Sequence, residues 1–412
     1  MRILIVTRNL PPLVGGMERL NWHMAAELAK FANVRIVGPA GSAALAPAGV
    51  VVREAPLKPL WKFLWRARSL ARKEARRWKP DVVLAGSGLT APIARSVARA
   101  CGSRTAVYLH GLDVAVRNFI YRALWLPAIR RMDRVIANSH ATAELCCGIG
   151  IDSAHIGIVR PGVDLPVDSE PLSPRERGRG AGALPRDATV DASRRSAPAP
   201  DDSFRQRHHL GEGPLLLSVG RLSARKGLRE FVTHALPRIV AAQPDILLLI
   251  VGDAPSQALH AEAQTPASIR DAAELAGVGG CIRFLGKVPD DELTALYRTA
   301  DVHIFPVREI RGDPEGFGMV AVEAAAHGLP TVAFATGGVV DAVADGQSGR
   351  LISTGDYPAF AEAVAVTLTQ RETLRESCIE FAGRFAWPKF GMGIAEQLAS
   401  VGGFQCASDT PS

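Results

Sequence analysis

The sequence predicts an α/β protein of two doubly wound domains, each built around a parallel β-sheet. Three observations lead to this prediction. Short runs of Val, Ile and Leu alternate with helical patterns in both halves of the chain, as in parallel sheets that helices cover on both faces. The length of 412 residues suits about two or three domains. Finally, a segment with very few apolar residues separates the two halves.

The expected elements follow the same order in each half. The first half opens with an apolar strand, a Pro/Gly loop and a helix over residues 17–31, and the second half repeats the alternation. In such domains the loops at the carboxyl ends of the strands bind ligands. The strands expected are 2–6, 34–37, 81–84, 105–109 and 134–137 in the first half, and 215–219, 246–251, 282–285, 302–305, 331–334 and 349–352 in the second.

Composition sets the expected domain boundaries. Residues 166–207 are rich in Pro, Gly, Arg, Ser and Ala and almost free of aromatic or branched apolar residues, which predicts a disordered linker or insertion. We therefore expect an N-terminal domain over residues 1–165 and a C-terminal domain over 208–388. Residues 389–412 are expected to form a helix that crosses back to the N-terminal domain, followed by a disordered tail.

The charge of the chain is unevenly distributed. Residues 1–165 hold 24 Lys/Arg against 10 Asp/Glu, whereas residues 208–412 hold 16 against 24. A basic half indicates a negatively charged partner. No nucleic-acid recognition motif is present, so we do not expect nucleic acid to be that partner. The longest apolar run, residues 246–251, is far below the roughly 18 residues of a membrane span.

The most informative stretch is the one in which Glu315 and Glu323 bracket seven residues. Gly316 and Gly318 indicate a tight loop, and the small residues that follow predict a helix ended by a Gly-Leu-Pro sequence. At the two ends of about two helical turns, the carboxylates would project from one side. The free N–H groups of the helix N-terminus attract anions. Such a site suits a nucleotide sugar, which has hydroxyl groups at both ends and phosphate in between.

Three other loops carry candidate ligand-binding residues. Arg221 and Lys226 follow a strand and could clamp a diphosphate, although a solvated basic loop is an alternative. Gly15 and Gly16 precede a helix and would let phosphate or sugar approach the backbone, unless they form a plain turn. His110 follows another strand, where a structural role is the alternative.

Together these motifs resemble a retaining glycosyltransferase of the GT-B fold in family GT4, over nearly the whole chain outside the linker. The resemblance implies two Rossmann-like domains that face each other across a cleft. Its strength lies in the order of the motifs and in the paired glutamates. The matching residues are Gly15-Gly16, His110-Gly111, Asn138-Ser139, Pro161-Gly162-Val163-Asp164, Gly220-Arg221, Lys226-Gly227, Val251-Gly252-Asp253, Phe284-Leu285-Gly286, Glu315 to Glu323, Pro330, Thr336-Gly337-Gly338 and Phe385-Ala386-Trp387.

The resemblance also implies a role for each site residue. Arg221 and Lys226 would bind the donor diphosphate and stabilise the leaving group. Glu323 would accept hydrogen bonds from the ribose, Glu315 would orient the donor sugar, and His110 would contact the sugar near the anomeric centre. No cofactor or metal is expected, because no D-x-D motif is present. The other implied donor contacts are Gly15 and Gly16, the base-binding loop at Gly286 and Val288, and the backbone amides of Phe317, Gly318 and Met319.

A basic segment from Leu57 to Lys79 indicates where an acceptor binds. It holds nine Lys/Arg and one Asp/Glu. Apolar residues from Leu60 and Trp61 onward recur at helical spacing, whereas Phe63 falls outside that stripe. This pattern suits a helix on an anionic membrane surface, and the alternative is an ordinary surface helix with a solvated basic face. A second stretch, residues 117–134, places aromatic residues among five arginines.

The expected function is transfer of a hexose, with retention of configuration, from GDP-mannose or a UDP-sugar. The acceptor would be lipid-linked or a polysaccharide precursor, as in bacterial lipopolysaccharide assembly. The enzyme would be cytoplasmic and peripheral to the inner face of the membrane. Alternatives are a soluble acceptor, a non-catalytic nucleotide-sugar-binding protein and an epimerase of the same fold. A nicotinamide dehydrogenase would need G-x-G-x-x-G after the first strand, which residues 8–19 lack.

Overall fold

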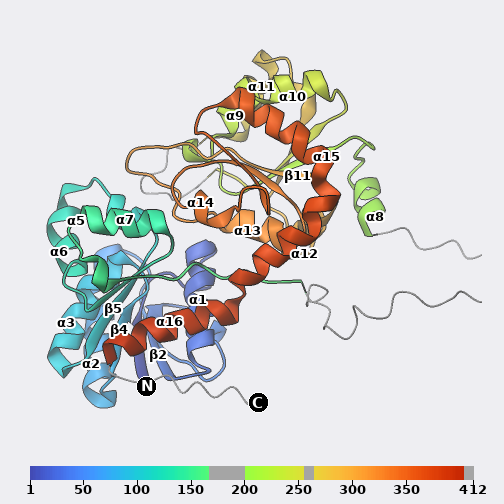
Figure 1. Ribbon diagram of the computed structural model, residues 1–412. Coiled ribbons are helices and arrows are strands. Elements are labelled where there is room, and N and C mark those ends of the chain that lie inside the picture. The colour runs from blue at the N-terminus through green and yellow to red at the C-terminus, as the bar shows by residue number, and fades with distance from the viewer. Residues whose placement is uncertain (167–199, 255–263, 403–412) are drawn as a thin grey trace, which may run out of the picture.

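Two α/β domains make up the structure (Figure 1). The computed structural model describes residues 1–166, 200–254 and 264–402. One sheet has seven strands and the other six, and every strand pairing between named strands in this part of the chain is parallel. The predicted fold class of two doubly wound parallel-sheet domains is therefore confirmed.

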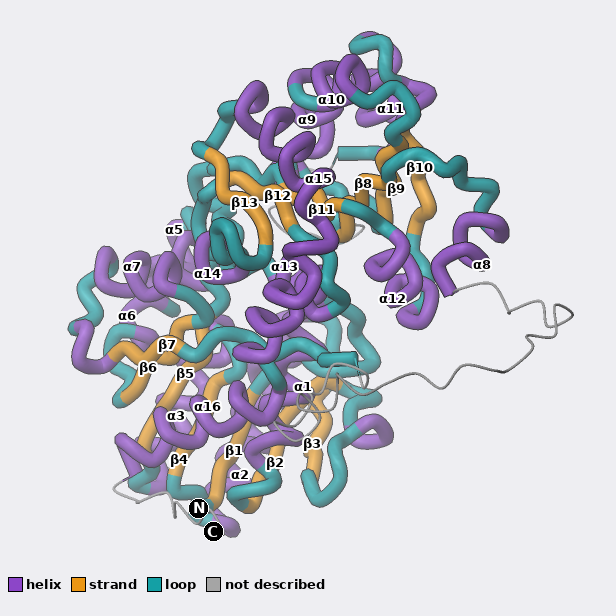
Figure 2. Tube along the Cα trace, turned by 45° about the vertical axis from the view of Figure 1, so that its right-hand side comes forward, coloured by secondary structure: helices purple, strands orange, loops and turns teal. Residues whose placement is uncertain are grey.

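The sheet of the N-terminal domain has the order β3-β2-β1-β4-β5-β6-β7 (Figure 2). The chain builds outward from β1 on one side and then from β4 on the other, and ligand-binding loops gather where this order reverses. Sequence analysis missed β3 and β7. β3 is an edge strand that exposes Arg53 and Glu54, and β7 is very short. The strands are β1 (Arg2–Val6), β2 (Asn33–Pro39), β3 (Val51–Ala55), β4 (Val82–Ala85), β5 (Arg104–Leu109), β6 (Arg134–Ala137) and β7 (Ile156–Ile158).

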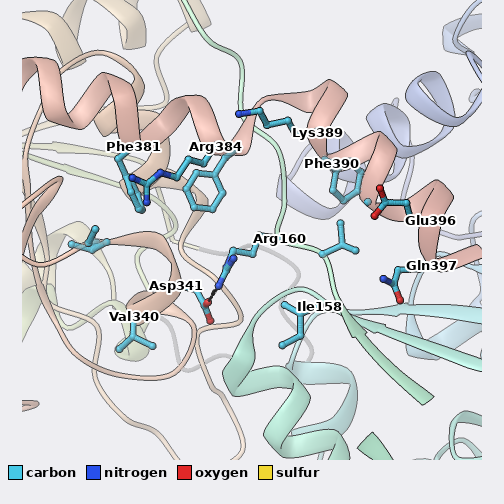
Figure 3. A pocket seen from close by; sticks show the side chains of 15 residues that line it. Ile158, Arg160, Val340, Asp341, Phe381, Arg384, Lys389, Phe390, Glu396 and Gln397 are labelled. Atoms are coloured by element: carbon cyan, nitrogen blue, oxygen red, sulfur yellow. Dashed lines mark hydrogen bonds and ion pairs between the residues drawn. The ribbon is translucent and has the colours of Figure 1, made fainter. Parts of the chain in front are cut away.

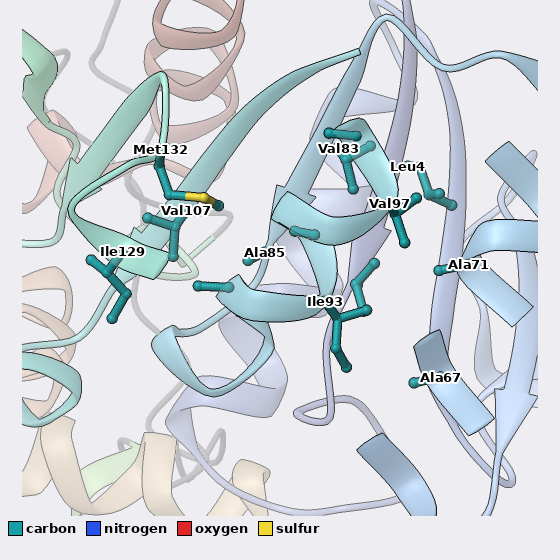
Figure 4. Packing of buried hydrophobic residues seen from close by; sticks show 14 of the residues in the cluster. Leu4, Ala67, Ala71, Val83, Ala85, Ile93, Val97, Val107, Ile129 and Met132 are labelled. Atoms are coloured by element: carbon teal, nitrogen blue, oxygen red, sulfur yellow. The ribbon is translucent and has the colours of Figure 1, made fainter. Parts of the chain in front are cut away.

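Helices cover both faces of this sheet. α2 and α3 pack on one face through small residues such as Ala67, Ala71 and Val97, together with Leu4 and Val83 of the strands (Figure 4). α1 packs on the opposite face through Leu20 and Met24. The helices are α1 (Gly16–Leu28), α2 (Leu60–Trp78), α3 (Ala91–Cys101), α4 (Leu112–Ala115), α5 (Phe119–Leu124), α6 (Leu126–Ile129) and α7 (His140–Gly148).

The C-terminal domain repeats the arrangement around a sheet of order β10-β9-β8-β11-β12-β13. Three of its strands, β8, β11 and β12, are buried along their whole length. The strands are β8 (Leu215–Val219), β9 (Leu247–Val251), β10 (Ile282–Gly286), β11 (Val302–Phe305), β12 (Thr331–Phe334) and β13 (Gly349–Ile352). The helices are α9 (Leu228–His234), α10 (Leu236–Ala242), α11 (Pro266–Leu275), α12 (Asp290–Thr299), α13 (Met319–Ala326), α14 (Val339–Ala342) and α15 (Tyr357–Ala382).

The prediction that residues 166–207 form a disordered segment is wrong at the C-terminal end of that segment. Residues Pro200–Arg207 form helix α8 beside α12. Phe204 is fully buried there, in a core that includes Leu210 and Leu296. This single aromatic side chain supplies the apolar area that the rest of the segment lacks. Residues 167–199 of the expected linker lie outside the described residues.

The last described helix, α16 (Trp387–Gly402), returns to the N-terminal domain. It packs along α1 (Figure 1). Its Ile394 and Leu398 are buried in the core that also contains Leu20 and Met24 of α1. Arg134 of β6 donates a hydrogen bond of 2.8 Å to Gln397 of α16. The N-terminal domain therefore contains both ends of the described chain. The expected tail, residues 403–412, lies outside the described residues.

Helix α2 is amphipathic, but its buried stripe differs from the predicted one. Phe63 is fully buried and leads a stripe with Ala67, Ala71 and Ala75, whereas Trp61 is 68% exposed. The spacing of four residues from Phe63 onward places these side chains on one face. Trp61, which the expected apolar stripe included, therefore stands on the outer face of the helix and outside the buried stripe. No helix of the described ranges is long and apolar enough to cross a membrane.

Candidate donor-binding site

The loops at the carboxyl ends of the two sheets meet between the domains. His110 follows β5, and the loop that carries Glu315 precedes α13. Gly316 lies so close to the backbone carbonyl of His110 that it leaves no room for a side chain. At the same interface between the domains, Gly16 of α1 lies near Met319 of α13. A Cβ added to Gly16 would lie 3.7 Å from Sδ of Met319. The fold thus brings together His110, Gly16 and the Glu315 loop, which are far apart in the sequence.

Glu315 is buried against two cations of the β8–α9 loop. Lys226 Nζ donates a hydrogen bond of 2.8 Å to Glu315 Oε2, and Arg225 Nη1 donates to the same oxygen. Arg225 also lies 3.3 Å from Asp313. Sequence analysis missed Arg225, although it adjoins Lys226 in a short 3-10 turn. The sequence feature that could have indicated Arg225 is the pair of basic residues directly before Gly227.

The charges of this cluster keep Glu315 ionised. Burial by itself raises the pKa of the Glu315 carboxyl, but Lys226 and Arg225 together hold that pKa below its usual value. Arg221 is exposed on the same loop and near enough to contribute to this effect. Arg221, Arg225 and Lys226 carry three positive charges against the two negative charges of Glu315 and Asp313, so the cluster has one positive charge in excess. That excess suits a diphosphate.

The helix α13 begins at Met319, as the small-residue pattern after the Gly316–Gly318 loop predicts. Glu315 lies in that loop and Glu323 lies inside the helix, so the two carboxylates do not stand at the two ends of continuous helical turns, as their spacing had suggested. Gly318 takes a left-handed conformation with φ 97° at the helix N-cap, which turns the loop sharply. The first turn closes with Ala321 N–H donating to the Gly318 carbonyl, at 3.0 Å. The backbone amide of Met319, the first residue of α13, belongs to the N-terminal end of the helix, which attracts anions.

Glu323 lies inside α13 and reaches both the other domain and the neighbouring α12. Its Oε1 accepts a hydrogen bond of 3.0 Å from Arg19 Nη1 on α1, and its Oε2 accepts one of 3.3 Å from Tyr297. Burial raises the pKa of Glu323, and Arg19 opposes this shift. Arg19 also pairs with Asp164. Sequence analysis missed Arg19, which stands one helical turn after Gly16.

The other implied donor contacts surround this centre at different distances. Phe317 is buried in the core below α13, so only its backbone can face a ligand. Gly286 ends β10 with φ 66° and accepts a hydrogen bond of 2.7 Å from the Gly252 amide. Val288 packs in the same core as Tyr297, which links the expected base-binding loop to Glu323. His110 Nε2 lies 3.2 Å from the Gly86 carbonyl oxygen.

A second interdomain contact lies beside α14. Asp341 accepts hydrogen bonds from the backbone amide of His140 at 2.8 Å and from Arg160 at 2.8 Å. A cavity of about 410 Å³ adjoins this contact, and Arg384 and Lys389 also line it (Figure 3). None of the predicted donor-binding residues lines this cavity. It is therefore separate from the candidate donor site.

Two facing parallel-sheet domains with ligand loops between them are the GT-B architecture. The chain matches the family model for glycosyl transferases group 1 over residues 200–384 and the model for glycosyltransferase family 4 over residues 14–166. The chain belongs to glycosyltransferase family 4, a family of GT-B enzymes. The resemblance stated from the motifs is thereby confirmed.

Relatives and solved structures agree with this assignment. A GDP-mannose-dependent alpha-(1-6)-phosphatidylinositol monomannoside mannosyltransferase of Mycolicibacterium smegmatis is 28% identical over 96% of this chain and 98% of its own length. A D-inositol 3-phosphate glycosyltransferase of Catenulispora acidiphila is 32% identical over 64% of this chain, which spans only 55% of that relative. The fold matches Anabaena Alr3699/HepE, solved in complex with UDP, with a TM-score of 0.74 and 19% identity over 97% of this chain and all of that one.

Proposed function

We propose that this chain transfers a hexose from a nucleoside-diphosphate sugar to an acceptor hydroxyl, with retention of the anomeric configuration. The observation that carries the proposal is the buried cluster in which Lys226 and Arg225 hold Glu315 beside the N-terminus of α13. It offers excess positive charge for a diphosphate and an ionised acceptor of hydrogen bonds for a sugar. Glu323, eight residues further on, offers a second carboxylate for the ribose.

The proposed step breaks the bond between the anomeric carbon and the diphosphate oxygen. Lys226, Arg221 and the α13 N-terminus stabilise the negative charge that develops on the leaving group. Glu315 positions the sugar through its hydroxyls, because a carboxyl with a pKa below its usual value cannot donate a proton near neutral pH. The acceptor oxygen bonds to the anomeric carbon on the face that the leaving group vacates, and its proton passes to the departing phosphate. No metal or cofactor enters this proposal.

For the donor we favour GDP-mannose over UDP-glucose or UDP-N-acetylglucosamine. The sequence from Arg311 to Glu315 and the Thr336-Gly337-Gly338 loop support this choice, since both resemble mannosyltransferases of the family. The full-length relative from Mycolicibacterium smegmatis is named as GDP-mannose-dependent. The Gly337 position packs against the Glu315 carbonyl, so this loop forms one wall of the site.

For the acceptor we propose a lipid-linked glycan or polysaccharide precursor at an anionic membrane surface. The outer face of α2 supports this, because Trp61 and Trp65 are 68% and 64% exposed among its cations. Aromatic and basic side chains on one helix face are typical of helices that lie in a membrane interface. A soluble inositol phosphate is the second candidate, since several relatives are named as D-inositol 3-phosphate glycosyltransferases.

A panel of nucleotide sugars tests the proposal. Purified protein would be given each donor alone, with membrane lipid extract, or with inositol 3-phosphate, and nucleoside diphosphate release would be measured. We expect release with GDP-mannose that rises with lipid extract, and an NMR spectrum of the product in which the anomeric configuration of the donor is retained. Release stimulated only by inositol phosphate would select the soluble acceptor. An inverted product would reject the retaining reaction.

A further inference from the structure

A strongly basic groove lies on the N-terminal domain, away from the donor site. Residues of α2, α3 and α6 line it. Both α2 and α6 pack against α3 (Figure 1). The volume of the groove is about 570 Å³. The groove is lined by Ser96, by small or apolar side chains, and by the four arginines Arg72, Arg95, Arg99 and Arg131. No acidic residue is among the lining residues of this groove.

Carboxylates near this groove are engaged elsewhere. Glu74 of α2 is buried and binds Arg35 and Arg53 on the sheet side of that helix. Asp133 accepts hydrogen bonds from the amide and hydroxyl of Thr105, at 2.8 and 2.7 Å. The four arginines therefore give the groove a positive charge that no lining acid balances, and such a surface attracts anions.

One of these arginines is held in place. Arg72 donates a hydrogen bond of 3.0 Å to the Ser96 hydroxyl, which aligns α2 with α3. Partial burial lowers the pKa of Arg95, the positive charges of Arg99 and Arg131 lower it further, and Asp133 opposes this shift. Guanidinium groups form charge-assisted hydrogen bonds with the oxygens of a phosphate group.

Exposed apolar side chains lie on two of the helices that contribute residues to the groove. Trp61 and Trp65 stand on α2, and Phe119, Ile120 and Leu124 stand on α5 with exposures between 61% and 82% for these three. Leu124 itself lines the groove. A phosphate held by arginines and surrounded by exposed aromatic and aliphatic groups is the arrangement at a membrane interface.

We propose that this groove is a binding site for the phosphate headgroup of an anionic membrane lipid, separate from the donor and acceptor positions. The lipid phosphate would sit among Arg72, Arg95, Arg99 and Arg131. The flanking apolar side chains would enter the interface around it. This goes beyond the proposed function, in which α2 provides only a general basic and aromatic face. The groove would set the orientation of the N-terminal domain on the bilayer.

Full-length protein with vesicles tests the site. The groove variant carries Arg95→Gln, Arg99→Gln and Arg131→Gln, and the matched control removes the same charge from exposed positions of α2 by Lys73→Gln, Arg76→Gln and Arg77→Gln. Sedimentation with vesicles of phosphatidylcholine, with and without phosphatidylglycerol, gives the lipid affinity. Binding of soluble glycerol phosphate, followed by NMR, reports on the groove without a membrane.

We expect the groove variant to lose at least tenfold in affinity for phosphatidylglycerol vesicles and to lose glycerol phosphate binding. The control should keep glycerol phosphate binding and a larger part of its vesicle affinity. Equal loss in both variants would mean that net charge alone binds the membrane, and would overturn the site. Binding of glycerol phosphate or of an oligonucleotide, without binding of vesicles, would overturn the assignment to a lipid.

The same measurements separate this inference from the proposed function. Vesicle binding is measured without nucleotide sugar, so its outcome does not depend on the donor site. Nucleoside diphosphate binding by the groove variant, unchanged from that of the unmodified protein, would show that it folds. A protein that transfers sugar but binds no vesicle would contradict the headgroup site and the acceptor at a membrane surface, and would leave the proposed transfer from a nucleotide sugar intact.

Discussion

Arg19 Nη1 of the N-terminal domain lies 3.0 Å from Glu323 Oε1 of the C-terminal domain. The carboxylate that we assign to the donor ribose is therefore already bound by a cation from across the interface. Arg19 also pairs with Asp164. Donor binding and domain contact meet at one side chain, so closure of the domains and occupation of the site are coupled through Glu323.

The first prediction concerns Glu323. Glu323→Ala removes hydrogen bonds to a charged acceptor, each of which contributes about 1.5–3 kcal/mol, so KM for the donor should rise roughly 10- to 100-fold with little change in kcat. Steady-state kinetics with the active donor measure this. Arg19→Ala is the control that leaves the carboxylate in place, and it should change the donor KM much less. An unchanged KM in Glu323→Ala would remove Glu323 from the donor site.

The second prediction concerns Glu315. Glu315→Ala should lower kcat about 100-fold, because the sugar loses its positioning group, while nucleoside diphosphate still binds to the remaining cations. It should also destabilise the fold by about 3–5 kcal/mol, because Lys226 and Arg225 lose their buried partner. Single-turnover kinetics and urea unfolding measure the two effects. Unchanged turnover with a normal unfolding midpoint would contradict both.

Glu315 also gives a pH prediction. Its pKa is held below the usual value by Lys226 and Arg225, so it stays ionised as pH falls through neutrality. Its ion pairs are therefore fully present above its unfolded pKa and are lost only as pH falls through the lower folded value. We expect protonation of Glu315 to cause no loss of kcat between about pH 8 and about pH 5, because this window lies above ordinary carboxyl pKa values. An acid limb within that window that Glu315→Gln abolishes would contradict the assignment.

The third prediction concerns Phe204. This side chain is fully buried where α8 meets α12. Phe204→Ala should lower the free energy of unfolding by about 3–5 kcal/mol, as for other large-to-small core changes. Chemical denaturation of the full chain measures it. An exposed phenylalanine offers the matched control, since Phe119→Ala should have almost no effect. Equal effects would mean that α8 does not pack as described.

The fourth prediction concerns His23 at the contact between α1 and α16. Its ring stacks on Trp387 with 3.8 Å between centroids, and burial lowers its pKa from about 6.5 to about 4. The unfolded chain therefore takes up a proton before the folded one does. Stability from this contact is fully present above pH 6.5 and is lost as pH falls toward 4.

His23→Phe should reduce that acid loss. After allowance for solvent screening we expect the difference to be ~1–2 kcal/mol in unfolding free energy between the two ends of the window. Thermal unfolding across the pH range measures it, and His155→Phe at an exposed position serves as control. Parallel pH profiles for the unmodified protein and His23→Phe would show that the stack does not depend on a neutral imidazole.

Most of the fold could be predicted because its signals are local. Strands such as β4 and β9 are continuous runs of apolar residues, which is typical of strands in a parallel sheet covered on both faces. β3 was missed because an edge strand with Arg53 and Glu54 on its surface lacks that pattern. α8 was missed because its sequence is mostly polar and Phe204, which is buried, is the one aromatic residue in it. Neither signal stands out from composition.

The site was less predictable because its contacts join distant parts of the chain. Glu315 and Lys226 could be named from motifs, but their direct pairing requires the three-dimensional fold. Arg19 and Glu323 are separated by 304 positions, and no local pattern indicates that they touch. The start of α13 at Met319 could be predicted, because Gly316 and Gly318 indicate a loop and small residues follow it. The local sequence identifies the charged side chains, whereas the tertiary structure determines which of them form ion pairs with one another.

The central claim is that a nucleoside diphosphate binds between the β8–α9 loop and α13. Calorimetric titration of GDP and UDP into the unmodified protein, Lys226→Ala and the exposed control Arg238→Ala tests it most directly. We predict binding to the unmodified protein and to Arg238→Ala, with a loss of at least tenfold in Lys226→Ala. Equal affinity in all three proteins, or binding to none of them, would contradict the account.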